Sequence, residues 1–265
     1  MSSDWAELEY DARLVSELYH ENSKQWRSDP EVLERIVASS VSPMLQQLMG
    51  SSGKRYLHAR RTPLDAKPAA GRLGPLAEVL AGRHSTRAFV PERLGFEQAG
   101  TLLHLSAGIV GSLGGDGHAA PARSNPSAGA LYPVELYLCA ENVERLERGS
   151  YHYDPVASAV ELVAAGETGA RLAHLSHTAE LADAAAVVAL TGVPARARVK
   201  YGERAYRFLL LEAGHIAQNL LLVATALGLG SLPVGGFVDC ELDELLGIDG
   251  VDEISLYLIA IGPTG

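Results

Sequence analysis

One stretch constrains the fold more than any other: residues 203–227 contain no proline and a single glycine, Gly214. Apolar side chains fall on nearly every face of the helix that this stretch would form. A helix that is apolar all round belongs inside a large core, at a subunit interface or in a membrane. Three polar residues interrupt the pattern, Glu212, His215 and Asn219, at spacings that place them on one narrow stripe. Because an unpaired buried polar group costs about 1–3 kcal/mol, we expect hydrogen-bond partners for this stripe.

The segment after this helix has little side-chain bulk. Gly228 and Gly230 are typical of a left-handed helix end. Residues 231–236 are predicted to form a loop whose backbone can lie close to a ligand. The glycine spacing does not indicate a dinucleotide-binding fingerprint, because that motif follows a strand and opens a helix, whereas here the order is reversed. A long helix that leads into such a loop suits a flat cofactor.

Bulk composition excludes several classes of protein. At 265 residues, the chain is long enough for one large domain or one domain with an extension. A net charge of −10 argues against nucleic acids and anionic membranes as partners. Cys139 and Cys240 give no disulfide framework and no metal-ligand spacing, and the acidic N-terminus does not resemble a signal peptide. No purely apolar run reaches the roughly 18 residues of a membrane span. We therefore expect a cytoplasmic protein.

Hydrophobic patterns and turn residues predict an α+β domain with a central mixed sheet over residues 76–265. Residues 1–75 are predicted to form an extension, helical to about residue 40 and then an extended linker rich in Ser, Gly, Pro and Arg. Helices and strands alternate without a regular βαβ repeat, which favours the α+β class. The expected helices are 76–82, 96–107, 168–177, 203–227 and 241–246, the expected strands are 134–140, 151–155, 159–163, 185–191 and 254–261, and a glycine-rich loop is expected at 108–122.

Two short stretches have the composition of anion or heterocycle sites. Arg83, Ser85 and Arg87 alternate after the first expected helix of the domain, so an extended chain would place them on one side. Arg binds phosphate oxygens bidentately, although a solvated basic turn explains the pattern equally well. The loop 124–130 offers hydroxyls and free amides to the polar edge of a heterocycle or a polyol. Its alternative is a tight turn that feeds the next strand.

Lys200 and Tyr201 precede the long helix. A tyrosine with an ordinary pKa near 10 is a poor base at neutral pH, but nearby positive charge and a helix N-terminus would stabilise its phenolate. The alternative is a solvent-facing lysine beside a packed tyrosine. His174 and His177 share an expected helix but lack further ligands at suitable spacing, so no metal site is predicted.

Taken together, these stretches resemble the FMN-dependent nitroreductase superfamily. The resemblance rests on Arg83-x-Ser85-x-Arg87, on Ser124-Asn-Pro-Ser-Ala-Gly-Ala-Leu-Tyr-Pro133 and on the helix with Leu227-Gly-Leu-Gly230. The chain is similar in particular to the SagB-type, or azoline dehydrogenase, branch. That similarity is carried by Tyr19-His-Glu-Asn-Ser-Lys24, by the segment from Lys200 to Phe208 and by the segment from Leu211 to Asn219.

The resemblance implies a nitroreductase-like fold, with helices flanking the sheet and the long helix at the interface of a homodimer. It also implies FMN in each of two interfacial sites, with Lys200 and Tyr201 tied to catalysis. Arg83, Ser85 and Arg87 would hold the phosphate and ribityl chain, and Ser127 and Gly129 would lie along the isoalloxazine. The full set of implied FMN-binding residues is Arg83, His84, Ser85, Arg87, Ser124, Asn125, Ser127, Gly129, Gln218, Leu232, Pro233, Val234, Gly235 and Gly236.

The azoline branch oxidises thiazoline or oxazoline rings of ribosomally made peptides to aromatic azoles. The resemblance therefore implies an FMN-dependent dehydrogenase for such rings or a related small heterocycle, with dioxygen as the expected acceptor. No fused peptide-binding domain is evident, so we expect a separate partner, such as a cyclodehydratase-type enzyme, to deliver the peptide. Two alternatives stay open: an NAD(P)H-dependent reductase of nitro compounds, quinones or flavin, and a non-catalytic FMN-binding scaffold subunit of a biosynthetic complex.

Overall fold

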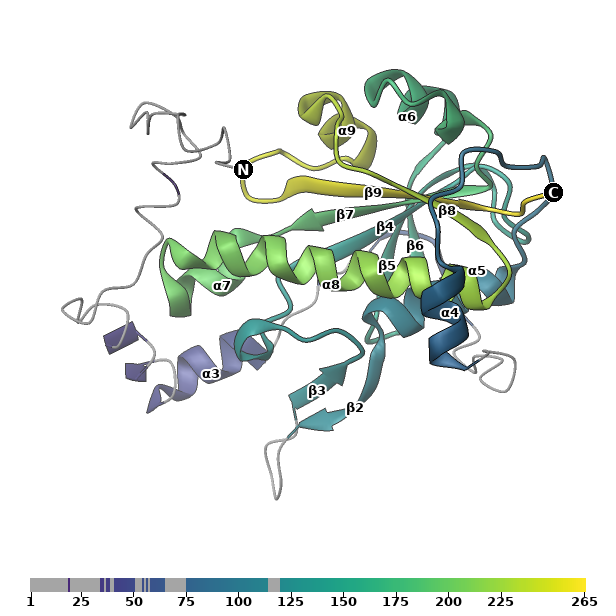
Figure 1. Ribbon diagram of the computed structural model, residues 1–265. Helices are drawn as coiled ribbons and strands as arrows, with labels where there is room; N and C mark the ends of the chain where they lie inside the picture. The colour runs from purple at the N-terminus through teal and green to yellow at the C-terminus, as the bar shows by residue number, and fades with distance from the viewer. Residues whose placement is uncertain are drawn as a thin grey trace, which may run out of the picture.

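A computed structural model describes residues 19, 34–35, 37–38, 41–50, 54, 56, 58–64, 75–113 and 120–265. Its centre is a seven-stranded sheet with the strand order β1-β6-β5-β4-β7-β9-β8 (Figure 1). The strands of this sheet are β1 (Arg61–Pro63), β4 (Val134–Ala140), β5 (Gly149–Asp154), β6 (Ala159–Ala165), β7 (Ala186–Gly192), β8 (Gly230–Val234) and β9 (Ile254–Gly262).

The α+β class with helices flanking a central sheet is confirmed, but the sheet is antiparallel rather than mixed. All six pairs of neighbouring strands in it run antiparallel. Parallel neighbours need a crossover that returns the chain to the same end of the sheet. Even the helix α9 (Asp239–Leu246), which lies between β8 and β9 in sequence, joins two antiparallel neighbours. A helix between two strands was therefore not a reliable sign of a parallel pair.

The two faces of the sheet bury different side chains because alternate residues of a strand point to opposite sides. Leu136 and Leu138 of β4 join the core formed with α5 (Phe96–Ala107) and α8 (Arg204–Ala226). Tyr137 and Cys139 join the core formed with α6 (Gly169–Leu175) and α9. Figure 1 shows α8 crossing one side of the sheet, with α6 and α9 on the other. A sheet covered on both faces explains why β4 and β7 are almost continuously apolar.

The long helix α8 differs from the prediction in its outer face. Leu210 and Leu211 are 44% and 55% exposed, so the helix is apolar all round but buried only toward the sheet. Glu212 is the one member of the predicted polar stripe that is buried. His215 is exposed because three residues advance a helix to a position about 60° away. Asn219 is half-buried and donates a hydrogen bond to the carbonyl of Ser106, at 3.3 Å.

The expected absence of a membrane partner and the cytoplasmic location stay predictions. In the described part of the chain, residues 194–226 are long and apolar enough to be considered as a membrane span, but half of their most apolar window is buried in the domain. This stretch also contains two helices, α7 (Pro194–Tyr201) and α8, separated at Gly202. Cys139 is buried and Cys240 is exposed, and both are free thiols.

Three other segments differ from their predictions. The expected loop 108–122 contains a hairpin of β2 (Ile109–Leu113) and β3 (Ala120–Arg123). The expected loop after Gly230 is the edge strand β8 as far as Val234. The glycines and prolines of both segments are typical of loops, and backbone pairing shows that they are strands. The expected linker contains α3 (Pro43–Gly50) and β1, which pairs with β6.

The boundary between residues 75 and 76 stays a prediction, and most of the extension predicted to be helical lies outside the described residues. The remaining elements are α4 (Leu76–Gly82) and the short 3₁₀ turns η3 (Ala128–Ala130) and η4 (Ala179–Ala182).

Candidate functional site

Lys200 and Tyr201 end the separate helix α7 instead of leading directly into the long helix. α7 stops because Gly202 has a φ of 57°, a conformation that favours glycine. The Tyr201 ring packs edge-on against Phe208 of α8, with centroids 4.9 Å apart. Burial raises the pKa of Tyr201. The predicted stabilisation of its phenolate is therefore absent, and the C-terminal end of α7 carries the negative end of the helix dipole.

The loop after β3 brings Gly129 against this pair. Gly129 has a φ of 64°, and a Cβ built on it would lie 2.7 Å from Tyr201 Oη and 3.1 Å from Lys200 Nζ. A residue with a side chain would displace both atoms. The structure thus brings together two groups that the sequence assigned to one site: the loop Ser124–Gly129 and the pair Lys200–Tyr201. We call them together the first half-site.

The backbone of this loop is strained and firmly held. Ala130 and Tyr132 have φ values of 54° and 46°, a conformation that costs a residue with a side chain about 1–2 kcal/mol. Tyr132 is fixed at three atoms. Its amide donates to Ser127 Oγ at 2.9 Å, its hydroxyl accepts from the Arg123 amide at 3.1 Å, and its carbonyl accepts from Arg196 at 3.1 Å. Strain that is held by so many contacts is typical of functional loops.

Glu212 of α8 lies beneath this loop and is 3% exposed. Ser127 Oγ donates to its carboxylate at 2.5 Å, and Asn125 Nδ2 donates at 3.4 Å. Burial raises the pKa of Glu212 to about 7, although these hydrogen bonds, one from the Val134 amide and the charge of Arg123 act in the opposite direction. The sequence indicated that Glu212 needs partners, but not that it belongs to the site.

A buried group of charges anchors α7 to the sheet. Arg196 of α7 forms an ion pair with Glu135 of β4, and His152 Nε2 donates to the same carboxylate at 2.9 Å. Burial alone would raise the pKa of Glu135, but the hydrogen bond from His152 and the charges of Arg196 and Arg123 outweigh it and lower the pKa to about 2. Sequence analysis did not predict the contacts of Arg123 and Arg196, since nothing in their local pattern shows which residues they meet.

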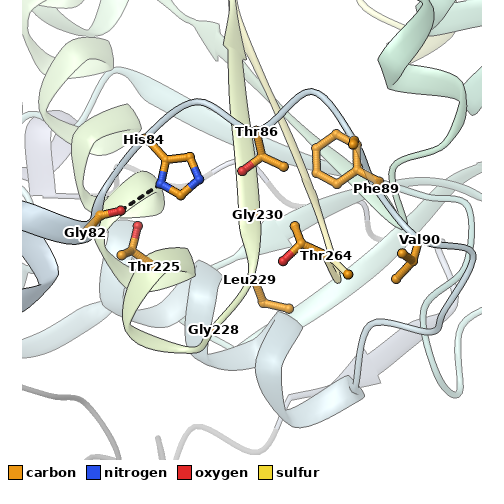
Figure 2. Close-up of a pocket in the computed structure, with 12 residues that line it drawn as sticks. Gly82, His84, Thr86, Phe89, Val90, Thr225, Gly228, Leu229, Gly230 and Thr264 are labelled. Atoms are coloured by element: carbon orange, nitrogen blue, oxygen red, sulfur yellow. Dashed lines mark hydrogen bonds between the residues drawn. The ribbon is translucent and has the colours of Figure 1, made fainter.

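The other predicted site residues lie near the C-terminal end of α8. Residues 83–90 run beside β8, and the Thr86 amide donates to the Ser231 carbonyl at 2.8 Å. We call Arg83–Arg87 and Leu232–Gly236 together the second half-site. Beside it, a pocket of about 680 Å³ opens between residues 83–90 and the end of α8 (Figure 2). Residues that line the pocket include His84, Thr86, Phe89, Thr225, Leu229, Gly230 and Thr264.

Alternate side chains of residues 83–87 lie either at the pocket or on the opposite side of the chain. His84 and Thr86 line the pocket, whereas Arg83, Ser85 and Arg87 do not. Figure 2 shows His84 close to Thr225 at the end of α8, and its Nδ1 donates to the carbonyl of Gly82, the last residue of α4, at 2.9 Å. Arg87 is exposed and pairs with Glu180 of η4 at 3.2 Å. The structure therefore separates His84 from the three residues predicted to hold the phosphate.

The predicted residues of β8 divide in a similar way. Leu232 and Val234 bury their side chains in the core beside α9, so only their backbone can reach a ligand. Pro233 is tolerated because β8 is an edge strand, where a missing N–H need not break a ladder hydrogen bond. Gly235 and Gly236 are exposed, and a Cβ on Gly236 would meet no atom within 4 Å.

The two half-sites are separate within one chain. The first contacts Glu212, whereas Gly82, next to the second, packs on Thr225. Thirteen residues of α8 separate Glu212 from Thr225, which corresponds to about 20 Å of helix. Gln218, predicted to bind the cofactor, lies between them and is exposed.

The residues present fit FMN. In the first half-site, Ser124 Oγ and Asn125 Oδ1 are buried, and neither has a hydrogen-bond partner in the described part of the chain. Such orphaned atoms are rare, and each calls for a ligand or a water molecule. In the second half-site, the guanidinium and hydroxyl groups of Arg83, Ser85 and Arg87 are the donors that a phosphate prefers. Within the described ranges, no three His, Cys, Asp or Glu side chains are grouped so that they could hold a metal ion.

Comparison with known proteins agrees with this geometry. Residues 80–263 match the Nitroreductase family. MJ1384 of Methanocaldococcus jannaschii, a protein classed as a nitroreductase, is 33% identical over 188 residues, which cover 71% of this chain and 90% of MJ1384. The microcin B17-processing protein McbC of Escherichia coli is 35% identical over 133 residues, 48% of this chain and 49% of McbC.

Solved structures show the same fold. A nitroreductase-type structure from Anabaena variabilis has a TM-score of 0.70 at 23% identity over 93% of this chain, which spans only 45% of that chain. A chain of the E. coli microcin synthetase McbBCD complex, solved with truncated pro-MccB17 bound, has a TM-score of 0.58 at 23% identity, covering 95% of this chain and 92% of that one. A structure from Exiguobacterium sibiricum in complex with FMN has a TM-score of 0.51 at 16% identity, covering 72% and 89%.

The predicted resemblance is thus confirmed by sequence and by structure, including similarity to the azoline branch through McbC. The family match covers more than two thirds of the chain and includes both half-sites. This chain belongs to the nitroreductase family, whose members are flavin oxidoreductases.

Proposed function

We propose that this chain is an FMN-dependent dehydrogenase that oxidises azoline rings of a ribosomally made peptide, or a related small heterocycle, to the aromatic azole. The observation that carries the proposal is the meeting of Lys200 and Tyr201 at Gly129, because it places two proton-handling groups at the predicted flavin loop. The similarity to McbC, a peptide-processing protein, supports this choice within the family.

The reaction assigns distinct tasks to the chain. Aromatisation removes a proton from one ring carbon and a hydride from its neighbour. FMN, when bound, supplies the hydride acceptor, and dioxygen is the expected final acceptor. Tyr201 keeps its proton at neutral pH because burial raises its pKa, so it can donate a hydrogen bond to a ring heteroatom. Lys200 Nζ reaches the same point, and in its neutral amine form it would accept the ring proton.

We further propose that two copies complete each site. The half-sites of one chain lie at separate places along α8, and the exposed Leu210 and Leu211 lie on the same helix. A twofold interface along α8 would place the first half-site of one copy beside the second half-site of the other. The McbBCD structure, a complex with a bound precursor peptide, supports the further proposal that a cyclodehydratase-type partner delivers the substrate.

A reductase that takes hydride from NAD(P)H and passes it to nitro compounds or quinones is the second candidate. It is favoured by the match to MJ1384, which extends over 90% of that protein.

Flavin spectroscopy followed by stopped-flow kinetics tests both candidates. The purified protein is expected to show flavin absorption, which an azoline-containing peptide bleaches under anaerobic conditions. Mass spectrometry of the peptide should then show the loss of two hydrogen atoms per ring. Bleaching by NADPH and not by the peptide would favour the reductase. A protein that binds FMN but is bleached by neither would indicate the non-catalytic scaffold, and a protein that binds no FMN would refute both candidates.

A further inference from the structure

Three segments of the chain converge on one buried carboxyl group beneath the first half-site. Glu212 accepts hydrogen bonds from Ser127, from Asn125 and from the backbone of Val134. It therefore ties the loop and the start of β4 to α8. Among its side-chain partners, Ser127 is half-buried, whereas Asn125 is buried, and Ser127 lies two residues before Gly129 in the loop of the first half-site.

The hydroxyl group of Ser127 can form at most three hydrogen bonds. A hydroxyl has one hydrogen to donate and two lone pairs that accept. Ser127 Oγ accepts from the Tyr132 amide at 2.9 Å and lies 2.5 Å from Glu212 Oε2. When Glu212 is ionised, it can only accept, so the Ser127 hydrogen is committed to it.

Protonation of Glu212 reverses this hydrogen bond. The carboxyl O–H then donates to the second lone pair of Ser127 Oγ, which still accepts from Tyr132. The hydrogen bond between Glu212 and Ser127 and the one from Tyr132 are both kept, and the Ser127 hydrogen becomes free. We propose that Glu212 is a positioning residue that decides whether Ser127 can donate a hydrogen bond to a heterocycle in the first half-site. The inference rests on the proposed function, under which that heterocycle is the isoalloxazine of FMN.

Burial and the surrounding charges together set the pH at which Glu212 changes its charge. Burial raises the pKa of Glu212 to about 7. Arg123 of β3 is the charged group that acts on Glu212 directly, while Glu135 of β4 and Arg196 of α7 act on Arg123. Arg123 stays charged throughout, and Glu135 stays ionised because its pKa is lowered to about 2. Of Glu212, Arg123 and Glu135, Glu212 is therefore the one whose charge changes around neutrality, and His152, which contacts Glu135, is another titratable side chain of this buried group.

Two variants mimic the two states of Ser127, with its hydrogen available to a ligand or not available. In Glu212→Gln, the amide N–H₂ can donate to Ser127 Oγ, which reproduces the protonated carboxyl at every pH. In Ser127→Ala, the donor is removed at every pH. The dissociation constant of FMN is measured by flavin fluorescence for wild type and both variants between about pH 5.5 and pH 8.5. The FMN phosphate itself titrates near pH 6, so the ratios of variant to wild type at each pH are compared.

One hydrogen bond corresponds to about a fivefold change in affinity. At the acidic end of the pH range, wild type should bind FMN as tightly as Glu212→Gln does. At the alkaline end, wild type should bind FMN about fivefold more weakly than Glu212→Gln. Wild type should bind FMN about fivefold more tightly than Ser127→Ala at the acidic end of the range. At the alkaline end, the two proteins should bind FMN equally well. Ratios that do not change with pH would overturn the inference.

A second measurement without cofactor separates this inference from the proposed function. The melting temperatures of flavin-free wild type and Glu212→Gln should diverge as pH rises through 7, because only the wild type must bury a new charge. A constant difference would overturn the inference even if FMN binds. If the difference grows but no FMN binds at any pH, the proposed function fails and the assignment of the Ser127 donor to a flavin fails with it.

Discussion

Gly129→Ala tests the contact on which the proposed function depends. The new methyl group would lie 2.7 Å from Tyr201 Oη and 3.1 Å from Lys200 Nζ, both closer than carbon atoms normally approach. These atoms are the ends of flexible side chains, so they should move while the fold persists. The substitution also strains the backbone, independently of these two contacts. Alanine at a φ of 64° should destabilise the protein by about 1–2 kcal/mol, because its Cβ crowds the following carbonyl.

Gly247→Ala is the matched control. Gly247 ends α9 with a φ of 69°, so alanine there has nearly the same backbone cost. Its nearest neighbour would be a methyl carbon of Val163 at 3.5 Å, an ordinary contact. Gly247 also belongs to neither half-site. Both variants should therefore lose roughly 2–8 °C in melting temperature, as expected for a chain of this size.

Turnover should distinguish the two variants. A displacement of about 1 Å in a positioned catalytic group can cost roughly a hundredfold in rate. Gly129→Ala should lose that much in single-turnover bleaching of bound flavin, whereas Gly247→Ala should stay within about twofold of wild type at a temperature where both are folded. If both variants keep wild-type rates, Lys200 and Tyr201 do not act at Gly129, and the catalytic assignment is wrong.

Four further substitutions test the remaining parts of the site. Arg87→Ala should weaken FMN binding about tenfold or more, measured by fluorescence, with little loss of stability because its pair with Glu180 is exposed. Tyr201→Phe should keep FMN but slow turnover roughly a hundredfold, and a wild-type rate would exclude a role for the hydroxyl. The raised pKa of Glu212 means that its stabilisation is complete below the unfolded pKa near 4.5 and lost as pH rises through 7, so Glu212→Gln should gain up to about 3 kcal/mol on wild type by pH 8 in denaturant titrations. Leu211→Glu should leave the chain folded but monomeric by light scattering, with weak FMN binding, and a dimer with normal affinity would refute the proposed interface.

Much of the fold could be predicted from local patterns. The long helix was placed within one residue at each end, because the stretch lacks proline and ends at glycine. The strands β4 and β7 were equally clear, since burial on both faces leaves a continuous apolar run. The hairpin of β2 and β3 and the edge strand β8 were missed because their glycines and prolines are typical of loops. What makes them strands is backbone pairing, of β2 with β3 and of β8 with β9, and the composition of the segments does not record that.

The candidate site was predicted less completely than the fold. Family motifs proposed the residues of both half-sites, and their alternation placed Arg83, Ser85 and Arg87 on one side, but nothing in the sequence predicted that His84 on the other side lines a pocket. The break at Gly202, which gives Tyr201 a helix C-terminus in place of the expected N-terminus, depends on one positive φ. The misplaced boundary removes one of the two reasons given for a stabilised Tyr201 phenolate, and the packing of Tyr201 against Phe208 agrees with the alternative of a packed tyrosine.

The separation of the half-sites has a thermodynamic consequence under the proposed dimer. Each complete site would take its phosphate-binding arginines from one copy and its flavin loop from the other. A ligand that contacts both copies binds the dimer better than the monomer, so FMN binding and dimerisation must strengthen each other by the same free energy. The exposed face of α8 need not hold the dimer alone, because the cofactor supplies part of the association energy. A single rigid helix that carries the buried Glu212, the exposed leucines and the contact to Gly82 would thus couple assembly of the protein to assembly of its site.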